Sequence, residues 1–326
     1  MGALAGGAGA SSVSGPYPPR MTDDLPPRAI EWVRAAVPGT RGVRVFGKFA
    51  GATTSSLHAV EVVRDGAPPL ALVLRRYTDA QVRAEEPQYP RTEAAALRAL
   101  DGAWGVVAPR LVAVDETGVA CDVPAVLMTR LDGRPTLTPP DVGAWVRGLA
   151  EAIAAVHRLD GAALDDVYQR WHDPRGLQPP RWSRQHAAWA RLIEASRDLE
   201  PTGETVLLHR DYHPGNVLWE DGAVSGIVDW PNACRGVAGL DVGHCRRDIA
   251  TTHGAETAEA FLAAYREASG GAPDALCDAL ALLDSSAGED GTRILGAYHA
   301  YGRTDLTLDI MRARLDEYAA LVADRL

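Results

Sequence analysis

The chain has 326 residues, of which 46% are hydrophobic and 23% are charged, and these proportions are ordinary for a soluble globular protein. This length allows either one large two-lobed domain or two smaller domains. The formal net charge of -10 disfavours nucleic acid as a partner. No apolar stretch is long enough to span a bilayer, so we expect no membrane partner either. The acidic balance is compatible with a cationic small substrate.

The cysteines and the N-terminal composition indicate the compartment. The four cysteines are scattered without a C-x-x-C pair, which favours free thiols in a reducing, cytoplasmic compartment. Residues 1–26 begin with a stretch rich in Gly, Ala, Ser and Pro that has neither a charged n-region nor an apolar h-region. We therefore expect a flexible extension here and not a signal peptide.

Residues 27–128 are predicted to form a small lobe made mainly of β-strands. The expected elements are, in order, a helix over 27–37, strands over 43–49, 56–63 and 70–77, a helix over 92–100, and strands over 106–114 and 123–128. Pro87 and Pro90 are expected to exclude Glu85 and Glu86 from a helix interior. A hinge over 129–133 follows.

The loop between the first two strands is a candidate phosphate-binding loop. Small and hydroxyl-bearing residues let backbone N–H groups and hydroxyls approach phosphate oxygens. An ordinary hairpin turn is the alternative, because the loop has no G-x-G-x-x-G pattern. The candidate residues are Gly51, Thr53, Thr54 and Ser55.

From Asp141 onward the pattern changes to helices, which predicts a larger, mostly helical lobe over 134–326. The helices are expected over 142–159, 186–199, 255–269, 273–283 and 306–326, with an irregular segment over 161–184. The fold class is therefore α+β, with two lobes.

The segment 206–230 carries the polar residues with the clearest chemical pattern. Asp211 precedes Asn216 by five residues, and Asp229 ends a predicted hairpin thirteen residues after Asn216. This order of residues is that of kinase catalytic loops, which carry a base and two metal ligands. Carboxylate and amide oxygens suit Mg²⁺, and Asp211 is then free to orient a hydroxyl and accept its proton.

Two other interpretations of this segment stay open at this point. His209 and His213 are four residues apart and could hold zinc on a helix, although Pro214 argues against a helix. Asp211, Asn216 and Asp229 could also be ordinary Asx residues of turns, which is less plausible for all three together.

The residues His209 to Leu218 resemble the H-[GR]-D-x-H-P-G-N-[VL]-[LI] signature of the aminoglycoside phosphotransferase and choline kinase-like family. Ile227-Val228-Asp229-Trp230 is similar to the metal-binding strand end of that family. The resemblance implies a two-lobed protein kinase-like fold and Mg²⁺-dependent transfer of phosphate from ATP or GTP. It also implies that His209 and Asp241 support the catalytic loop.

The same resemblance assigns roles in the small lobe. Arg75 would be the cation that holds the nucleotide phosphates, braced by Glu93, although two solvated arginines at a strand end are the alternative. The candidate loop would cover the phosphates, with Thr54 in place of the Asn that is common in the family. The nucleobase would contact the hinge through Met128, Thr129 and Leu131.

The acceptor is predicted to be a small hydroxylated molecule, most plausibly an aminoglycoside or another hydroxylated antibiotic. In the resembled family, acidic residues of the helical lobe hold the amines of aminoglycosides, and a solvated acidic helix pair is the alternative here. The candidates are Asp284, Glu289 and Asp290. A metabolic kinase of the choline, homoserine or sugar type and a catalytically silent nucleotide-binding scaffold are the rival functions.

Overall fold

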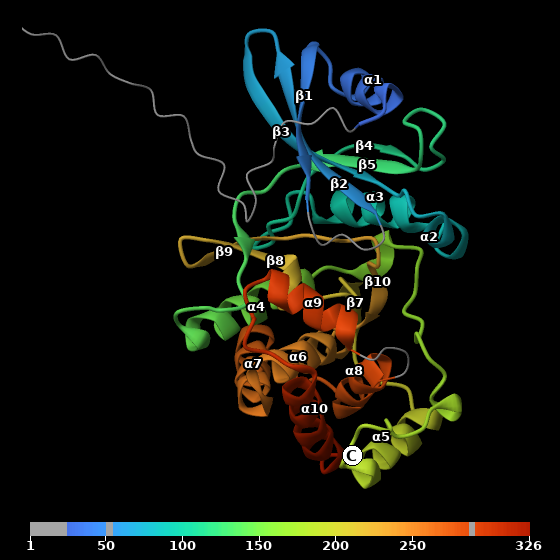
Figure 1. The fold of residues 1–326 in the computed structure, drawn as a ribbon, viewed down its shortest axis with the longest axis vertical. Helices are drawn as coiled ribbons and strands as arrows, with labels where there is room; N and C mark the ends of the chain where they lie inside the picture. The colour runs from blue at the N-terminus through green and yellow to red at the C-terminus, as the bar shows by residue number, and fades with distance from the viewer. Residues whose placement is uncertain (1–24, 50–54, 287–290) are drawn as a thin grey trace, which may run out of the picture.

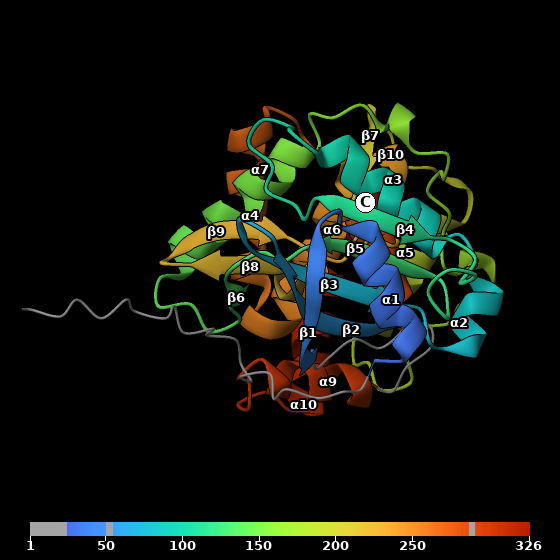
Figure 2. The same ribbon diagram turned by 90° about the horizontal axis from the view of Figure 1, so that it is seen from above.

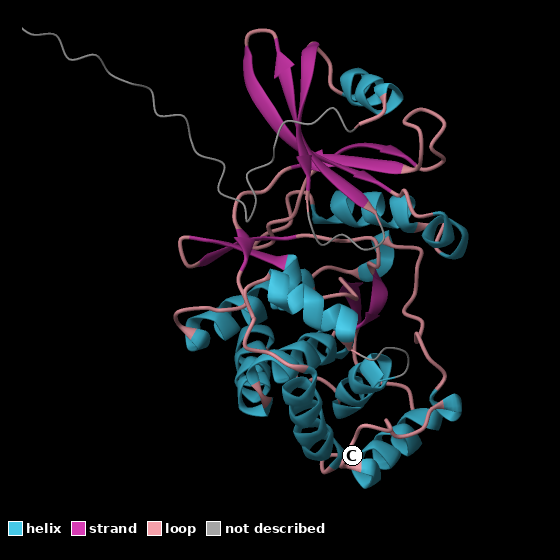
Figure 3. Cartoon of the chain, viewed as in Figure 1, coloured by secondary structure: helices cyan, strands magenta, loops and turns pink. Residues whose placement is uncertain are grey.

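The computed structural model describes residues 25–49, 55–286 and 291–326, and it separates strands and helices into two lobes (Figure 1). The strands gather at one end of the molecule and most helices at the other (Figure 3). The strands are β1 (Thr40–Lys48), β2 (Ser56–Arg64), β3 (Ala67–Arg76), β4 (Leu111–Asp115), β5 (Ala125–Thr129), β6 (Arg134–Pro135), β7 (Thr205–Leu208), β8 (Val217–Glu220), β9 (Ala223–Ile227) and β10 (Cys234–Val237). The helices are α1 (Pro27–Ala36), α2 (Ala80–Glu85), α3 (Tyr89–Leu100), α4 (Val142–Val156), α5 (His186–Asp198), α6 (Gly239–His253), α7 (Ala255–Ser269), α8 (Ala275–Ser286), α9 (Thr292–Ala300) and α10 (Leu308–Ala323).

The small lobe is an antiparallel five-stranded sheet in the order β1-β2-β3-β5-β4. Helix α1 packs on one face of it, and α3 lies between the sheet and the helical lobe (Figures 1 and 2). Because side chains alternate along a strand, Leu72 and Leu74 of β3 join the core under α1, whereas Val73 packs towards α3. The same alternation turns Arg75 towards α3 and the helical lobe.

The helical lobe is built around α6, of which every residue except Arg247 and His253 is buried. Helices α7, α8 and α10 pack around it, α4 packs on α7, and large buried side chains such as Trp145, Trp189 and Phe261 fill the core. Two small antiparallel sheets, β7 with β10 and β6 with β8 and β9, lie between this core and the small lobe (Figure 1). The loop from β7 to β8 therefore faces the boundary between the lobes.

The predicted α+β, two-lobed architecture with a β-rich small lobe and a helical large lobe is confirmed. Its boundaries at 27–128, 129–133 and 134–326 stay predictions. Among the described helices, none is long and apolar enough to cross a bilayer. The residues 1–24, Gly51, Thr53, Thr54, Glu289 and Asp290, on which other predictions rest, lie outside the described part of the chain.

Several element predictions were wrong. Helix α3 begins at Tyr89 and includes Pro90, because proline is tolerated in the first turn, where its missing N–H has no helical partner. Helices α2, α6 and α9 and strand β10 were not predicted. The strand expected over 106–114 begins only at Leu111, since Pro109 interrupts the run.

Candidate active site

The loop between β7 and β8 brings the candidate catalytic residues together. The apolar strand β7 carries the chain out of the core, and a short 3₁₀ turn over Pro214–Asn216 reverses it. The side-chain amide of Asn216 donates to the backbone carbonyl of Asp211, at 2.9 Å. The N–H of Val228 donates to the carbonyl of Asn216, at 2.9 Å, so the residue before Asp229 is tied to this loop. Asp211, Asn216 and Asp229 thus share one site.

Two residues of the site have left-handed backbone conformations that side chains disfavour. The φ angle is +68° at Arg210 and +73° at Asp229. Such conformations cost of order 1–3 kcal/mol and persist only where surrounding contacts enforce them. Asp241 supplies such contacts, because its carboxylate accepts the N–H groups of His209 and Arg210, both at 2.7 Å. The guanidinium of Arg210 also stacks on Tyr168 and Trp171.

Asp241 is a fully buried anion on the first turn of α6. Its carboxylate lies 3.2 Å from Nε2 of His157, a residue that follows α4. Burial raises the pKa of Asp241, but the hydrogen bonds from His157 and from the backbone of His209 outweigh it and lower the pKa below its ordinary value. The carboxylate therefore stays ionised and holds the backbone of the loop, and its expected support role in the reaction stays a prediction.

The ring of His209 is held by the protein on both sides. Its Nε2 lies 2.9 Å from the carbonyl oxygen of Val228, and its Nδ1 accepts the N–H of Asp211 at 3.3 Å. The ring also packs on Trp230, with 4.4 Å between centroids. Nδ1 of His213 likewise accepts a backbone N–H, from Gly215. These bonds leave the two histidines poorly placed to share a zinc ion, and the described residues contain no cluster of three or more His, Cys, Asp or Glu suited to a metal.

Arg75 contacts one carboxylate from each lobe. Its Nε lies 3.0 Å from Oε2 of Glu93 on α3, and its Nη2 lies 2.8 Å from Oδ1 of Asp229. Its Nη1 donates to the hydroxyl of Ser55, at 3.1 Å. Burial lowers the pKa of Arg75, but Glu93 and Asp229 outweigh it and raise the pKa, so the group stays cationic. The alternative of solvated arginines does not hold for Arg75, which is 4% exposed.

The carboxylate of Asp211 is surrounded by histidines. Its Oδ1 lies 3.3 Å from Nε2 of His244 on α6 and 4.0 Å from Nε2 of His213. Burial raises the pKa of Asp211, but the contact with His244 and the charges of His213 and His209 hold it well below its usual range. The side chain is 32% exposed, so an incoming hydroxyl can reach an ionised carboxylate.

The segment that holds these candidate active-site residues also matches the sequence model of a protein family. The model of the phosphotransferase enzyme family matches residues 58–278, which is more than half of the chain. The chain belongs to this family. Its β3 cation, its α3 acid and its two loop carboxylates are all within the matched residues.

This phosphotransferase has the fold of solved members of the family. It is similar to a candidate aminoglycoside phosphotransferase of Ralstonia eutropha JMP134, with a TM-score of 0.57, 19% identity, and 91% of this chain and 96% of that chain covered. It is also similar to a thermostable mutant of aminoglycoside phosphotransferase APH(4)-Ia in complex with AMP-PNP and hygromycin B, with a TM-score of 0.55, 15% identity, and 88% and 99% covered. At these identities the likeness shows the fold, which is the kinase-like fold that the sequence predicts.

A shorter stretch of the phosphotransferase resembles a metabolic enzyme. It is 34% identical over 99 residues to the homoserine kinase of Gluconacetobacter diazotrophicus. The stretch covers 28% of this chain and 30% of the relative, so the chain matches less than a third of that protein's length.

The hinge residues of this phosphotransferase are partly engaged by the sheet. Met128 is 4% exposed, and the N–H of Thr129 donates to the carbonyl of Arg110 at 2.9 Å. Leu131 packs over Gly226, where any side chain would collide with it. Contact of the nucleobase with Met128, Thr129 and Leu131 therefore stays a prediction. The N–H of Thr129 is already used in its hydrogen bond to Arg110.

Asp284, a candidate for binding a cationic acceptor, is not an isolated surface carboxylate. Its Oδ1 lies 3.5 Å from Nδ1 of His172, and the side chain is only 16% exposed. Burial raises its pKa, while His172, Arg210 and Arg247 oppose that rise. Asp284 is therefore neither a solvated helix residue nor a fully free anion.

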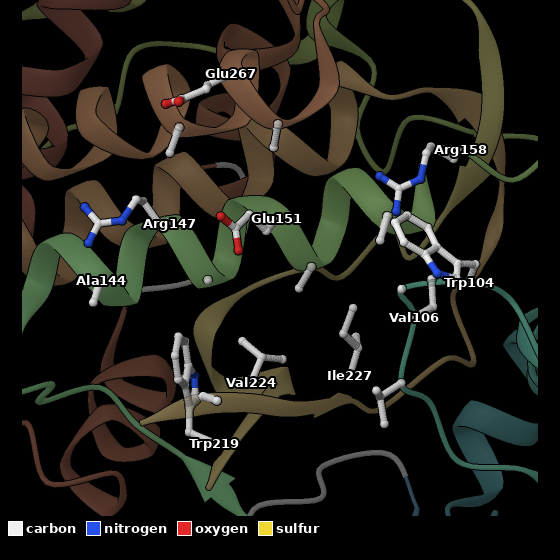
Figure 4. A pocket seen from close by; sticks show the side chains of 18 of the residues that line it. Trp104, Val106, Ala144, Arg147, Glu151, Arg158, Trp219, Val224, Ile227 and Glu267 are labelled. Atoms are coloured by element: carbon white, nitrogen blue, oxygen red, sulfur yellow. The ribbon is translucent and has the colours of Figure 1, made fainter. Parts of the chain in front are cut away.

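A cavity of about 690 Å³ lies behind the hairpin of β8 and β9, between α4 and α7 (Figure 4). Trp219 and Val224 of the hairpin face Glu151 on α4 across it, and Glu267 of α7 lies at its far side. A pocket of this size is the usual first candidate for a binding site. However, none of the candidate catalytic residues lines this cavity. The active site is therefore better identified by the polar side chains of Asp211, Asn216 and Asp229 than by cavity volume.

Proposed function

We propose that this phosphotransferase transfers the γ-phosphate of ATP or GTP to a hydroxyl of a small molecule, with Mg²⁺ as the metal. The observation that carries the proposal is the position of Arg75, which joins Glu93 of the small lobe to Asp229 beside the catalytic loop. A cation held between these carboxylates lies where nucleotide phosphates would meet both lobes. Positioning and charge neutralisation supply most of the rate in such transfers.

The residues Asn216 and Asp229 fit a magnesium ion. The amide nitrogen of Asn216 is used by the loop, which turns its oxygen away as a free acceptor, and Arg75 contacts one oxygen of Asp229. Two protein oxygens with open positions suit Mg²⁺, which keeps several waters and binds phosphates. When bound at these residues, the ion would neutralise charge on the phosphate oxygens.

Asp211 is the proposed base. Its low pKa keeps it ionised, so it orients the acceptor hydroxyl and takes its proton as the new oxygen–phosphorus bond forms. The bond between the γ-phosphorus and the bridging oxygen breaks in the same transfer, and the nucleoside diphosphate leaves. Arg75 steadies the phosphates during this step, and Asp241 and His209 keep the loop in place.

The acceptor class that we favour is an aminoglycoside or another hydroxylated antibiotic. Structures of the same fold hold AMP-PNP with hygromycin B, in APH(4)-Ia, and ATP with streptomycin, in APH(2")-IIa. These complexes support an antibiotic acceptor and ATP as the donor. The negative charge of Asp284 is partly offset by His172, Arg210 and Arg247. We therefore count neutral hydroxylated antibiotics as well as cationic ones among the candidate acceptors.

A metabolic kinase is the second candidate, and the observation that favours it is the stretch similar to homoserine kinase. A small amino alcohol would then replace the antibiotic as acceptor. A catalytically silent scaffold is the remaining alternative, and it would bind nucleotide without any turnover that depends on Asp211.

One experiment separates these candidates. Release of ADP or GDP is measured with Mg²⁺ across aminoglycosides, macrolides, homoserine, choline and simple sugars, with Asp211→Asn as the control. We expect one acceptor class to raise the rate and the substitution to abolish it. Nucleotide binding without turnover for any acceptor would favour the scaffold, and absence of nucleotide binding would overturn the proposal.

A further inference from the structure

Two arginines close to helix α6 are held by carboxylates, whereas a third is not. Arg246 is ion-paired with Asp278, and Arg303 is ion-paired with Asp305 at 2.8 Å. Arg247 of α6 has no such partner. Among the described residues, no carboxylate lies within 4.0 Å of it and no oxygen accepts a hydrogen bond from its guanidinium. A guanidinium without a counter-charge is a candidate for binding an anion.

The guanidinium of Arg247 contacts a neutral ring instead. Its Nη2 donates to Nε2 of His244 at 2.9 Å and lies 3.4 Å from Nδ1. Burial and the charge of Arg247 lower the pKa of His244, so the ring accepts this hydrogen bond without offsetting the positive charge. The Nε atom of Arg247 is buried and has no hydrogen-bond partner among the described residues, which is uncommon for a buried polar group. The N–H groups on Nη1 donate to no described residue either.

His244 places this cation close to the proposed base. Its Nε2, which accepts from Arg247, also lies 3.3 Å from Oδ1 of Asp211. Both Arg247 and Asp211 are partly exposed, so a ligand can reach the space next to them. A small molecule that presents a hydroxyl to Asp211 can therefore bring a second group to Arg247.

The other groups that interact with Arg247 already have partners. Asp284 of α8 interacts with it electrostatically, but Oδ1 of Asp284 lies 3.5 Å from Nδ1 of His172. On α9, the hydroxyl of Tyr298 donates to Asp248 at 2.7 Å, and burial raises the pKa of Tyr298, so the phenol stays neutral. The charge of Arg247 is thus left for a ligand.

We propose that Arg247 binds a carboxylate of the acceptor and thereby holds the acceptor hydroxyl at Asp211. A guanidinium pairs with a carboxylate through parallel hydrogen bonds, which are stronger than bonds between neutral groups. The inference rests on the proposed phosphotransfer function and narrows its acceptor to molecules that carry both a hydroxyl and a carboxylate. Such a molecule is either a hydroxy amino acid or an acidic hydroxylated antibiotic, and the two sources are tested separately.

The first test compares acceptors that differ only in the carboxylate. Homoserine is paired with aminopropanol, which lacks the carboxylate, and fusidic acid, a hydroxylated antibiotic, is paired with its methyl ester. Release of ADP is measured with Mg²⁺ for the parent protein, Arg247→Met and Arg247→Lys. In the parent, we expect kcat/KM for the acid of one pair to exceed that of its partner by about 10- to 100-fold, as hydrogen bonds to a charged group predict.

The variants assign this preference to Arg247. Arg247→Met should raise KM for the acid about tenfold or more and leave KM for ATP unchanged within about twofold, and Arg247→Lys should keep part of the preference. The exposed Arg266→Met is the matched control and should leave the preference unchanged. Thermal unfolding of each variant separates loss of binding from misfolding.

Three results would overturn the inference while leaving phosphotransfer intact. The first is a preference for the acid that survives in Arg247→Met. The second is turnover of an aminoglycoside that is as efficient as that of either acid. The third is a rise in KM for ATP and not for the acid, which would assign Arg247 to the nucleotide phosphates.

A second measurement does not depend on turnover. Binding of the same two pairs to the whole protein with AMP-PNP and Mg²⁺ is followed by titration calorimetry. The acid of one pair should bind about tenfold more tightly than its partner, or better, and Arg247→Met should abolish the difference. Equal or absent binding within both pairs would overturn the inference. A difference that depends on the carboxylate and on Arg247, without turnover, would instead count against the proposed function alone.

Discussion

The Nη2 atom of Arg75 lies 2.8 Å from Oδ1 of Asp229, so a cation of the small lobe directly contacts a carboxylate of the helical lobe. The same guanidinium is paired with the fully buried Glu93. Arg75 therefore contributes both to the stability of the fold and to the candidate active site, and the two contributions can be separated by substitution.

Arg75→Met is expected to lower the free energy of unfolding by about 3 kcal/mol, because it leaves the Glu93 carboxylate buried without its cation. Denaturant titration would measure this change. The double variant Arg75→Met with Glu93→Leu should recover at least half of the loss, since the only carboxylate of the two left without Arg75 is Asp229, which is 40% exposed to solvent. The exposed ion pair of Arg44 with Glu61 supplies the control, and Arg44→Met should cost less than about 1 kcal/mol. A double variant less stable than Arg75→Met would contradict this account.

Asn216→Ala is expected to raise the Mg²⁺ concentration needed for half-maximal turnover by about tenfold or more, because it removes one of the two proposed oxygen ligands. The substitution also removes the bond to the carbonyl of Asp211, so kcat should fall as well. Asn216→Asp keeps an oxygen ligand and should need less Mg²⁺ than Asn216→Ala. An unchanged Mg²⁺ requirement in Asn216→Ala would exclude this residue as a ligand.

His253 is expected to make the fold sensitive to mild acid. Burial, together with the nearby Arg303, lowers its pKa to about 4. The folded pKa thus lies below the ordinary value of about 6.5, and the unfolded chain binds more protons between these two pH values. Stability from the neutral ring is complete above about pH 6.5 and is lost as the pH falls towards 4, by up to about 3 kcal/mol.

The measurement for His253 is the free energy of unfolding at pH 7 and pH 5. His253→Gln should show a smaller loss between the two values than the parent protein, whereas the exposed His186→Gln should show the same loss as the parent. An equal loss in His253→Gln and the parent would mean that other groups cause the acid sensitivity.

Asp284→Asn is expected to change KM for a cationic acceptor by less than about threefold. The charge of Asp284 is shared with His172 at 3.5 Å and opposed by Arg210 and Arg247, so little of it is left to attract an amine. Steady-state kinetics with an active aminoglycoside would test this. A tenfold rise in KM would instead support the sequence-based prediction that Asp284 binds an amine of the acceptor.

The loop chemistry was predictable because it depends on local order in the chain. Asp211, Asn216 and Asp229 follow one another through a tight turn and a hairpin, whose geometry brings them together without help from distant segments. The pairing of Arg75 with Glu93, which lie 3.0 Å apart, was expected from the family resemblance alone. The resemblance of the motif supplied the expected roles.

Helix α6 could not be predicted, and with it the contact of His244 with Asp211 was missed. Periodicity reveals a helix when one face is apolar and the other is polar. Nearly all of α6 is buried, and its polar residues are satisfied by distant partners, such as Arg246 by Asp278 and Asp248 by Tyr298. The three-residue spacing of Asp241, His244 and Arg247 is visible in the sequence. Only the structure shows that α6 packs against the loop, so that Asp241 and His244 contact it.

The sequence by itself thus determined the α+β class and the order of the loop residues, because hydrophobic pattern and turn chemistry act over short stretches of chain. The resemblance of its motifs indicated the family. The tertiary structure alone decided which groups surround each carboxylate. Glu93 and Asp241 owe their burial, and Asp211 its contact with His244, to segments far apart in the chain. Such contacts depend on how helices and strands pack in three dimensions, and no local pattern encodes that packing.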